Sequence, residues 1–359
     1  MNSAPTIRLA LPGKGALESA TLTFLTECGM KVSRNNPRQY LARVGSMPDL
    51  EVVFQRAADI PLLVQDGDAA LGITGHDILA EHRGTADEEG DEDEYDDDII
   101  VLERDLGFGS CRLVVAVPET WIDVSTCADL WHLAGYYFAH KKRGLRIATK
   151  YPTLTGQFLR RHGITHCKII SPHGALEAAP LTDTADLIVD LTETGTTLRE
   201  NHLKLLDDGV VLRSQACLIA NARLLRENEQ ALHLASMMLE LIEARMQARN
   251  RSMLTAHMQA ETPEEMQRIF TTLTQRLQSL VSGLEFQASN SEGDVTSNSY
   301  RYTISGVLNV AGSTAGFLEV VATLRSAGAV HINVMPLTYH FAQESVSVHT
   351  LNKRLKRKY

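Results

Sequence analysis

One segment, residues 185–198, constrains the fold of this chain more than any other. An apolar run with β-branched members, Leu187 to Leu191, leads into acidic and hydroxyl-bearing residues and then into a Thr-Gly-Thr-Thr turn at 194–197. The run predicts a short strand, and the pattern from Leu198 to Leu205 predicts the start of a helix. Backbone N–H groups and hydroxyls in such a turn can surround an anion, helped by the helix dipole. The segment favours a phosphate-binding turn; the alternative is a turn in which Thr194 or Thr196 only caps the helix.

Composition and charge limit the class of protein. The chain has 359 residues, of which 44% are hydrophobic, enough for two or three globular domains. Its net charge of −9 is concentrated in ten acidic residues between Asp87 and Asp98. The remainder is close to neutral, which argues against a nucleic-acid partner. We predict a solvated, disordered acidic loop at 83–98 and a solvated basic tail at 353–358. An interaction or metal-binding role for the loop, and a targeting or docking role for the tail, are the alternatives.

The cysteines and the apolar runs bear on the compartment. Five cysteines are widely spaced without a Cys-x-x-Cys pair, which favours reduced, buried thiols over a zinc site or a disulfide framework. The first fifteen residues lack the basic region and the apolar core of a signal peptide. No apolar run approaches the roughly 20 residues of a membrane span. These features predict a cytoplasmic protein without membrane contact.

The order of the predicted elements suggests three structural parts. Strands and helices alternate along the first 222 residues and a long helix is predicted over Arg223 to Arg249, so we expect α/β sheets covered by helices. Residues 1–108 and 213–250 are assigned to lobe I and residues 109–212 to lobe II, with a ligand cleft between them as in periplasmic binding proteins. Residues 251–336 follow the βαββαβ order of a ferredoxin-like (ACT-like) domain, expected to regulate or oligomerise. Residues 337–359 would be a basic extension.

Further motifs follow one another in a specific order. They are Leu-Pro-Gly-Lys-Gly at 11–15, Leu-Gly-Ile-Thr-Gly-His-Asp at 71–77, Asp-Leu-Gly-Phe-Gly-Ser-Cys-Arg-Leu at 105–113, Arg-Ile-Ala-Thr-Lys-Tyr-Pro at 146–152 and Gly-Ala-Leu-Glu-Ala-Ala-Pro at 174–180. Together with the turn at 194–197, they make the chain resemble the long form of ATP phosphoribosyltransferase, the enzyme that opens histidine biosynthesis. The resemblance covers residues 6–336. No single motif would be sufficient for it.

This resemblance implies a site for phosphoribosyl pyrophosphate around the turn. The predicted binding residues are Asp190, Glu193, Thr194, Gly195, Thr196, Thr197 and Leu198, with Asp190 and Glu177 as the catalytic acidic residues. Gly195 would let the backbone approach the 5′-phosphate closely, and the Asp190 carboxylate suits the ribose hydroxyls as an acceptor. For Glu177 the alternative is a surface carboxylate at a helix start.

The resemblance also implies an ATP site on the other lobe. Its predicted residues are Lys14, Gly15, Arg56, Thr74, Gly75, Asp77 and Arg112, with Arg146 and Lys150 as further candidates. Ordinary surface or interlobe ion pairs are the alternative for the charged members. Ala16 stands where family members usually have arginine, so one expected cationic contact is missing.

The implied reaction joins the ribosyl C1 to N1 of the adenine of ATP and releases pyrophosphate. N1 has an accessible lone pair, so placement of the substrates and charge stabilisation should dominate over base catalysis. Mg²⁺ would arrive on the substrate rather than on protein ligands. The resemblance further implies inhibition by L-histidine through the carboxyl-terminal domain and a homo-oligomer, from dimer to hexamer. A non-catalytic regulatory relative and a two-lobed solute-sensing module remain alternatives.

Overall fold

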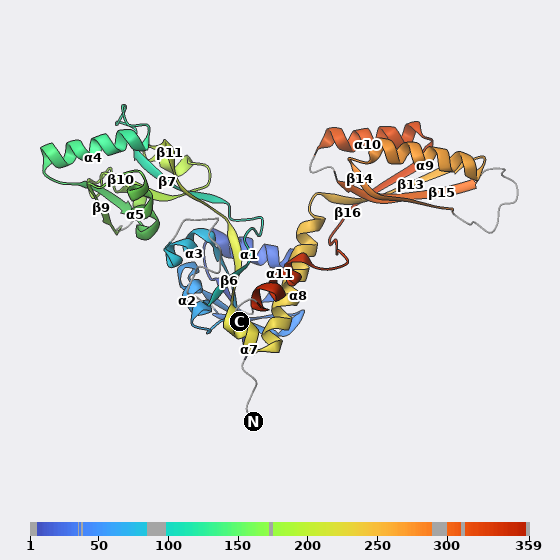
Figure 1. Cartoon of the computed structure of the whole chain (residues 1–359), viewed down its shortest axis with the longest axis horizontal. Helices are drawn as coiled ribbons and strands as arrows, with labels where there is room; N and C mark the ends of the chain where they lie inside the picture. The colour runs from blue at the N-terminus through green and yellow to red at the C-terminus, as the bar shows by residue number, and fades with distance from the viewer. Residues whose placement is uncertain are drawn as a thin grey trace, which may run out of the picture. The chain divides into compact units, whose positions relative to one another are not determined.

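The computed structural model describes residues 6–34, 36, 39–84, 98–171, 175–288, 300–309 and 313–356. These residues form two compact units, the first made of residues 1–239 with 346–359 and the second of residues 240–345. Figure 1 shows the elements of each unit. The predicted acidic loop lies mostly outside the described residues, as does the Ser/Asn-rich segment at 289–299.

Lobe I is a seven-stranded sheet in the order β2-β3-β4-β1-β5-β12-β6. Strands β4, β1 and β5 run parallel, so their carboxyl ends meet at one edge of the sheet. The chain folds here as β1 (Ile7–Pro12), α1 (Ala16–Glu27), β2 (Val32–Ser33), β3 (Leu41–Val44), β4 (Met47–Gln55), η1 (Ala57–Asp59), α2 (Ile60–Gln65), β5 (Leu71–Gly75), α3 (His76–Arg83), β6 (Ile99–Glu103) and, after lobe II, β12 (Ala216–Asn221) and α7 (Ala222–Glu227).

Lobe II is a five-stranded sheet in the order β11-β7-β10-β8-β9. Strand β10 lies at its centre, antiparallel to β7 and parallel to β8. Its elements are β7 (Cys111–Pro118), α4 (Cys127–Lys141), β8 (Leu145–Thr149), α5 (Pro152–Arg161), β9 (Cys167–Ile170), η3 (Leu176–Ala178), β10 (Leu187–Thr192), α6 (Thr196–Glu200) and β11 (Leu203–Ser214). The chain crosses between the lobes twice, and the crossings are joined by hydrogen bonds from Leu106 N to Ala216 O (3.1 Å) and from Ala216 N to Phe108 O (3.0 Å).

Two helix predictions need correction. The helix expected from Leu198 ends at Glu200, and Leu203 already belongs to β11. His202 has a positive φ of 56°, which ends the helix and turns the chain into the strand. The long helix predicted over 223–249 is two helices, α7 and α8 (Glu229–Ala248). Asn228 separates them, and its side chain accepts a hydrogen bond from Ala231 N (3.0 Å) at the start of α8.

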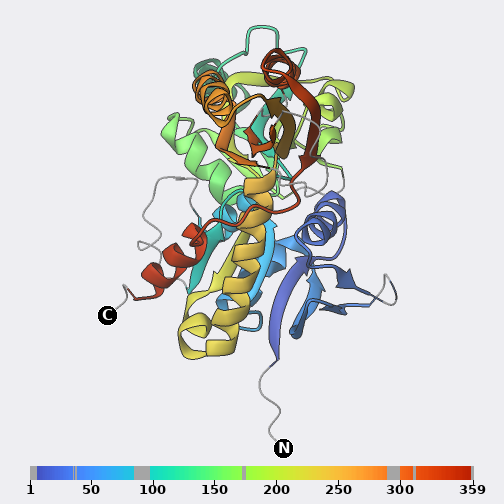
Figure 2. The ribbon, with the colours of Figure 1, turned by 90° about the vertical axis from the view of Figure 1, so that its right-hand side faces the viewer.

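The described part of the predicted basic tail, residues 353–356, belongs to a helix. Residues Val346–Lys356 form α11, which packs against α7 and β6 of lobe I. Leu351 and Leu355, four residues apart, are buried in this contact. Arg354 Nη1 donates to Val101 O (2.7 Å) on the edge strand β6. Figure 2 shows α11 in red beside the yellow α8.

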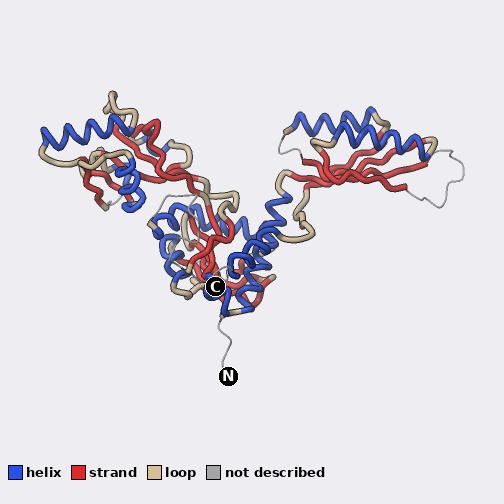
Figure 3. Tube along the Cα trace, in the orientation of Figure 1, coloured by secondary structure: helices blue, strands red, loops and turns tan. Residues whose placement is uncertain are grey.

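The second unit holds a four-stranded antiparallel sheet in the order β14-β15-β13-β16. Its elements are β13 (Arg251–Ala260), α9 (Pro263–Leu277), β14 (Val281–Ala288), β15 (Tyr300–Asn309), α10 (Thr314–Ser326) and β16 (Ala329–Pro336), which is the predicted βαββαβ order. Figure 3 shows both helices on the same face of this sheet. The boundary between the units falls inside α8, so residues 240–250 group with this sheet rather than with lobe I. No helix within the described ranges is both long and apolar enough to cross a membrane.

Candidate functional site

The Thr-Gly-Thr-Thr turn lies at the carboxyl end of β10, as the sequence predicts. Gly195 is the N-cap of α6 and has a φ of +77°, in the left-handed region that favours glycine. Thr192 Oγ1 accepts a hydrogen bond from Gly195 N (2.8 Å), and the hydroxyls of Thr194 and Thr196 lie 2.9 Å apart. The N-cap has no side chain, so neither Thr194 nor Thr196 is the cap residue of the alternative interpretation. The hydroxyls of both are exposed and available to an anion.

The other side chains of the turn are either buried in the core or exposed. Leu198 is buried in the core of lobe II and fixes the first turn of α6. Glu193 and Thr197 are exposed. The backbone N–H of Thr196 donates to Thr194 Oγ1 (3.4 Å), whereas the N–H of Thr197, in the first turn of the helix, lacks an intrahelical partner and can donate to a ligand. The turn therefore combines a fixed backbone with an exposed set of donors.

Asp190 carries a carboxyl whose environment perturbs its titration. Burial raises the pKa of its carboxyl to about 6, assisted by the negative charge of Glu177, while the Leu191 N–H and the positive charge of Lys150 oppose the rise. Leu191 N donates to Asp190 Oδ1 at 2.9 Å. Glu177 lies in the first turn of η3 and is half-buried. The structure thus brings Asp190, Glu177 and Lys150 together at one end of the lobe II sheet.

The predicted ATP residues of lobe I gather at the carboxyl ends of β1, β4 and β5. Gly13 N donates to Gln55 O (2.7 Å), which places the Lys14–Gly15 turn beside Arg56. Lys14, Gly15 and Arg56 are exposed. The carboxyl end of neighbouring β5 carries two further predicted residues, Thr74 and Gly75, both buried. Thr74 Oγ1 donates to Ala57 O (3.0 Å), so its hydroxyl secures η1 against β5.

The lobe II candidates for ATP divide into two groups. Arg112 pairs with Thr192 in the sheet and therefore lies next to the turn. Arg146 does not belong to the site: it lies level with Asp186, at the opposite end of the sheet from Asp190. Its guanidinium contacts Asp186 Oδ1 (3.0 Å) and Asp183 Oδ1 (2.5 Å). Arg146 therefore forms an ordinary ion pair, which was the alternative to ATP binding for the charged candidates.

Asp77 has partners that sequence reasoning missed. Ser214 Oγ donates to its Oδ1 (2.6 Å), and the phenol of Tyr151 donates to its Oδ2 (2.5 Å). All three side chains are buried. Burial, together with the charge of Asp77, raises the pKa of the Tyr151 phenol far above its ordinary value and that of the nearby Cys111 thiol to about 11. Tyr151 belongs to the motif at 146–152. Its hydrogen bond with Asp77 could not be predicted from the local sequence, because the two residues are 74 positions apart.

One group of side chains in lobe II has ligand types suited to a metal ion. Ligand atoms of Cys127, His162 and Asp208 lie within 4.8 Å of one another. Asp208 Oδ1 already accepts from Cys127 N (2.7 Å) at the start of α4. Burial and the hydrogen bond with Asp208 raise the pKa of the Cys127 thiol to about 12, so the thiol is protonated at neutral pH. The contact between Asp208 and α4 accounts for this arrangement without a metal.

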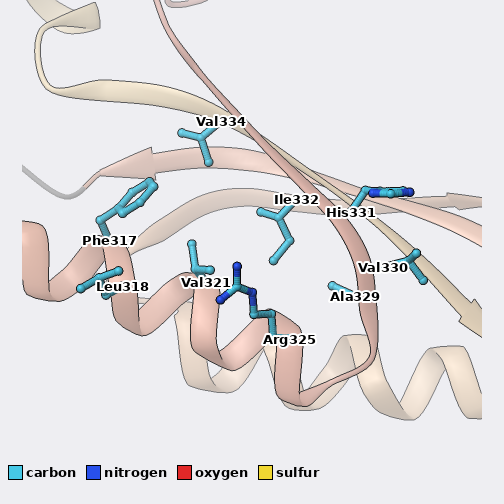
Figure 4. A pocket seen from close by; sticks show the side chains of 9 residues that line it. All are labelled: Phe317, Leu318, Val321, Arg325, Ala329, Val330, His331, Ile332 and Val334. Carbon is cyan, nitrogen blue, oxygen red and sulfur yellow. The ribbon is translucent and has the colours of Figure 1, made fainter.

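The antiparallel unit contains a cavity of about 470 Å³ between α10 and β16. Figure 4 shows Val321 and Arg325 of α10 facing Ile332 of β16 across it. Apolar side chains form most of its lining, together with Arg325 and His331: Phe317, Leu318, Val321, Ala329, Val330, Ile332 and Val334. A small amphipathic molecule with an anionic group would fit such a lining.

The arrangement in the first unit defines a class of protein. An acidic strand end beside a hydroxyl-rich turn, with cationic loops on the other lobe, is what an enzyme acting on a sugar phosphate and a second anionic substrate requires. Comparison with known proteins identifies the family within this class. The family model described as HisG: ATP phosphoribosyltransferase matches residues 56–247.

Individual relatives agree with the family model. ATP phosphoribosyltransferase 2, chloroplastic, of Arabidopsis thaliana is 36% identical over 344 residues, which cover 94% of this chain and 78% of the relative. The ATP phosphoribosyltransferase of Brucella melitensis is 45% identical over 219 residues, covering 60% of this chain and 90% of the relative. In the solved ATP phosphoribosyl transferase (HisG:HisZ) complex from Thermotoga maritima, one chain is 28% identical, with 66% and 98% of the two chains covered and a TM-score of 0.48. The chain belongs to the ATP phosphoribosyltransferase family, whose reaction is the first step of histidine biosynthesis.

Proposed function

We propose that phosphoribosyl pyrophosphate binds at the carboxyl end of β10. The 5′-phosphate is held by the hydroxyls of Thr194, Thr196 and Thr197 and by the backbone of Gly195, whose left-handed φ lets the chain turn around an anion. The Asp190 carboxylate accepts hydrogen bonds from the ribose hydroxyls. The single observation that carries this proposal is the half-buried Asp190, with a pKa raised to about 6, four residues before a turn of exposed hydroxyls.

ATP binds, in this proposal, at the carboxyl ends of the lobe I strands. Lys14 and Arg56 lie in neighbouring loops, and two exposed cations side by side suit a triphosphate. The Lys14–Gly15 turn and the Thr74–Gly75 strand end provide backbone groups for the nucleotide. Arg112, beside the turn of lobe II, contributes a cation on the side of the departing pyrophosphate. The carboxylate of Asp77 is already occupied by two hydroxyl donors, so we assign it no contact with ATP.

The reaction follows from placing these substrates in line. Adenine N1 attacks the ribosyl C1 with its own lone pair, the bond from C1 to pyrophosphate breaks, and the bonding electrons leave with pyrophosphate. Asp190 and Glu177 face the positive charge that develops on the ribosyl ring, where an anion stabilises it. No side chain is required to remove a proton from the nucleophile. The chain's main contribution is to hold two anionic substrates at reacting distance.

The residues near the turn include carboxylates that could contact a divalent cation carried by the substrate. Asp190, Glu177 and Glu193 have carboxylate oxygens, which are the donors that Mg²⁺ prefers, but they do not form a three-ligand cluster of their own within the described residues. When bound with the substrate, Mg²⁺ would neutralise charge on the pyrophosphate. We expect the ion to be carried mainly by the substrate.

An assay of pyrophosphate release tests the activity directly. The purified chain is incubated with ATP, phosphoribosyl pyrophosphate and Mg²⁺, and each component is omitted in turn. Release should require all three. Release without ATP, or none with all components present, would overturn the proposal and favour a non-catalytic relative or a solute-sensing module.

We also propose that the antiparallel unit binds L-histidine as an inhibitor. The cavity between α10 and β16 supports this, because Arg325 could pair with a carboxylate while the apolar lining covers the rest of the ligand. Histidine should lower pyrophosphate release in the wild type, and Arg325→Ala should weaken that inhibition while leaving the uninhibited rate unchanged. A homo-oligomer, from dimer to hexamer, and a cytoplasmic location remain predictions; the Arabidopsis relative is described as chloroplastic.

A further inference from the structure

Helix α3 of lobe I contacts α5 and β11 of lobe II. Its Ala80 is buried and belongs to a hydrophobic cluster whose other members come from lobe II. The partner element is α5, which begins directly after β8. Both helices start at the carboxyl end of a parallel strand, so their amino-terminal ends lie at the edges where the substrates are proposed to bind.

Four side chains at these helices connect the lobes through three contacts. Asp77, near the start of α3, accepts from the phenol of Tyr151 at the N-cap of α5 (2.5 Å). One turn further along α3, Glu81 accepts from Thr153 N (2.8 Å) with one oxygen and from Leu154 N (2.9 Å) with the other. Gln157 of α5 donates to Gly84 O. The spacing of 77, 81 and 84 places all three contacts on one face of α3.

The chemistry of these contacts makes them specific. Glu81 satisfies two of the N–H groups that a helix leaves unpaired at its amino terminus, and its charge lies at the positive end of the α5 dipole. Asp77 is 3% exposed, so its carboxylate depends on Tyr151 and Ser214 for hydrogen bonds in place of water. A change in the relative position of the lobes would break these bonds together. They therefore hold one spacing between the lobes.

We propose that α3 and α5 form an interlobe clasp, and that Tyr151 and Glu81 are positioning residues for the transfer reaction. The inference rests on the proposed function. The clasp sets the distance between the nucleotide edge of lobe I and the sugar-phosphate turn of lobe II without contacting either substrate. The residue of the clasp nearest to the site is Tyr151, and the negative charge of Asp190 contributes to the raised pKa of its phenol.

The test separates positioning from binding and from folding. Each substrate is held mainly by one lobe, so Tyr151→Phe should leave the Kd of each substrate alone within about twofold while kcat falls roughly 10- to 100-fold, the range expected when reacting atoms are misplaced by about 1 Å. Glu81→Ala should behave in the same way, and Glu81→Gln, which keeps one acceptor oxygen, should lose less. Tyr136→Phe, on an exposed tyrosine of α4, is the matched control and should retain the wild-type kcat.

Three results would overturn the clasp. The first is a kcat within twofold of wild type in Tyr151→Phe, and the second is a fall in kcat accompanied by a tenfold rise in the Kd of one substrate, which would place Tyr151 in contact with that substrate. The third is unchanged hydrogen exchange of the Thr153 and Leu154 amides in Glu81→Ala, because the clasp requires their exchange to accelerate. Exchange does not depend on turnover. If the wild type releases no pyrophosphate, the proposed function fails, and the exchange result still decides whether the clasp exists.

Discussion

The fold holds the carboxyl of Asp190 at a cost in stability, and this cost can be measured. Burial raises the pKa of its carboxyl from an ordinary value of 3.8 to about 6. Each pH unit of difference between the folded and unfolded values corresponds to about 1.4 kcal/mol, so the ionised carboxylate destabilises the folded state by about 3 kcal/mol. Asp190→Asn keeps the shape of the side chain and removes the charge. We expect this variant to be more stable than the wild type at pH 8, by up to about 3 kcal/mol.

The sign of the pH dependence follows from linkage. A folded-state pKa above the unfolded value means that the folded protein binds the proton more tightly. The wild type therefore loses stability relative to Asp190→Asn as the pH rises from about 4 to above 6. At pH 4, where the carboxyl of the folded wild type is already protonated, the two proteins should unfold at nearly the same temperature.

Thermal unfolding of both proteins at pH 4, 6 and 8, followed by calorimetry, is the assay. For a unit of 150 to 250 residues, 3 kcal/mol corresponds to a rise in midpoint of about 6 to 12 °C. The same variant should lose most of its turnover, since the amide cannot supply a negative charge to the developing ribosyl cation. Equal midpoints at pH 8, or a difference that does not change between pH 4 and pH 8, would refute the assignment of a buried, high-pKa carboxylate to Asp190.

Three further predictions concern the turn, the last helix and an ion pair. Gly195→Ala forces a side chain into a left-handed conformation, so it should lower stability by about 1 to 2 kcal/mol and raise the KM for phosphoribosyl pyrophosphate; an unchanged KM would argue against the turn as its site. Leu351→Ala empties a buried position between α11 and lobe I and should cost about 2 to 5 kcal/mol in urea unfolding, whereas Val346→Ala, at an exposed position, should cost little. Burial would raise the pKa of Asp186, but hydrogen bonds from Arg143 and Arg146 outweigh it and hold that pKa well below its ordinary 3.8. The resulting stabilisation is complete above pH 4 and lost as the pH falls below it, so the difference in unfolding midpoint between wild type and Asp186→Asn should shrink in acid.

Local patterns predicted the parts of the fold that local chemistry decides. The strand before the turn, its glycine and its hydroxyls were readable because they are consecutive in the sequence. The length of α6 was not readable, because residues 198–205 suit a helix as well as a strand. A long-range strand pairing ends the helix and starts β11, because Leu203 lies opposite Pro118 in the lobe II sheet. The split of the long helix at Asn228 was missed for a different reason: its signal is local, a cap hydrogen bond from Ala231 N to the Asn228 side chain, inside a pattern that reads as one helix.

The final helix and the clasp illustrate two different limits. Leu351 and Leu355 are spaced for one helical face, so α11 carried a local signal that the surrounding basic residues obscured. The contact of Asp77 with Tyr151 and Ser214 spans 74 and 137 residues of sequence and carried no local signal. The family resemblance made Asp77 a candidate for the ATP site, and the structure places it at the start of α3, directly after β5. The sequence could not show that both carboxylate oxygens would already be occupied.

The structure shows which residues surround Ala16, at the position where family members usually have arginine. Ala16 is the first residue of α1, and the turn before it is fixed by Gly13 N on Gln55 O. That hydrogen bond joins the β1 and β4 loops, so Lys14 and Arg56 form a pair of exposed cations one strand apart. Arg34 also lies near the start of α1, but its guanidinium contacts Glu18 Oε1 (2.8 Å) and covers the Phe54 ring. In the proposed function, Lys14 and Arg56 supply the positive charge that an arginine at position 16 would otherwise add.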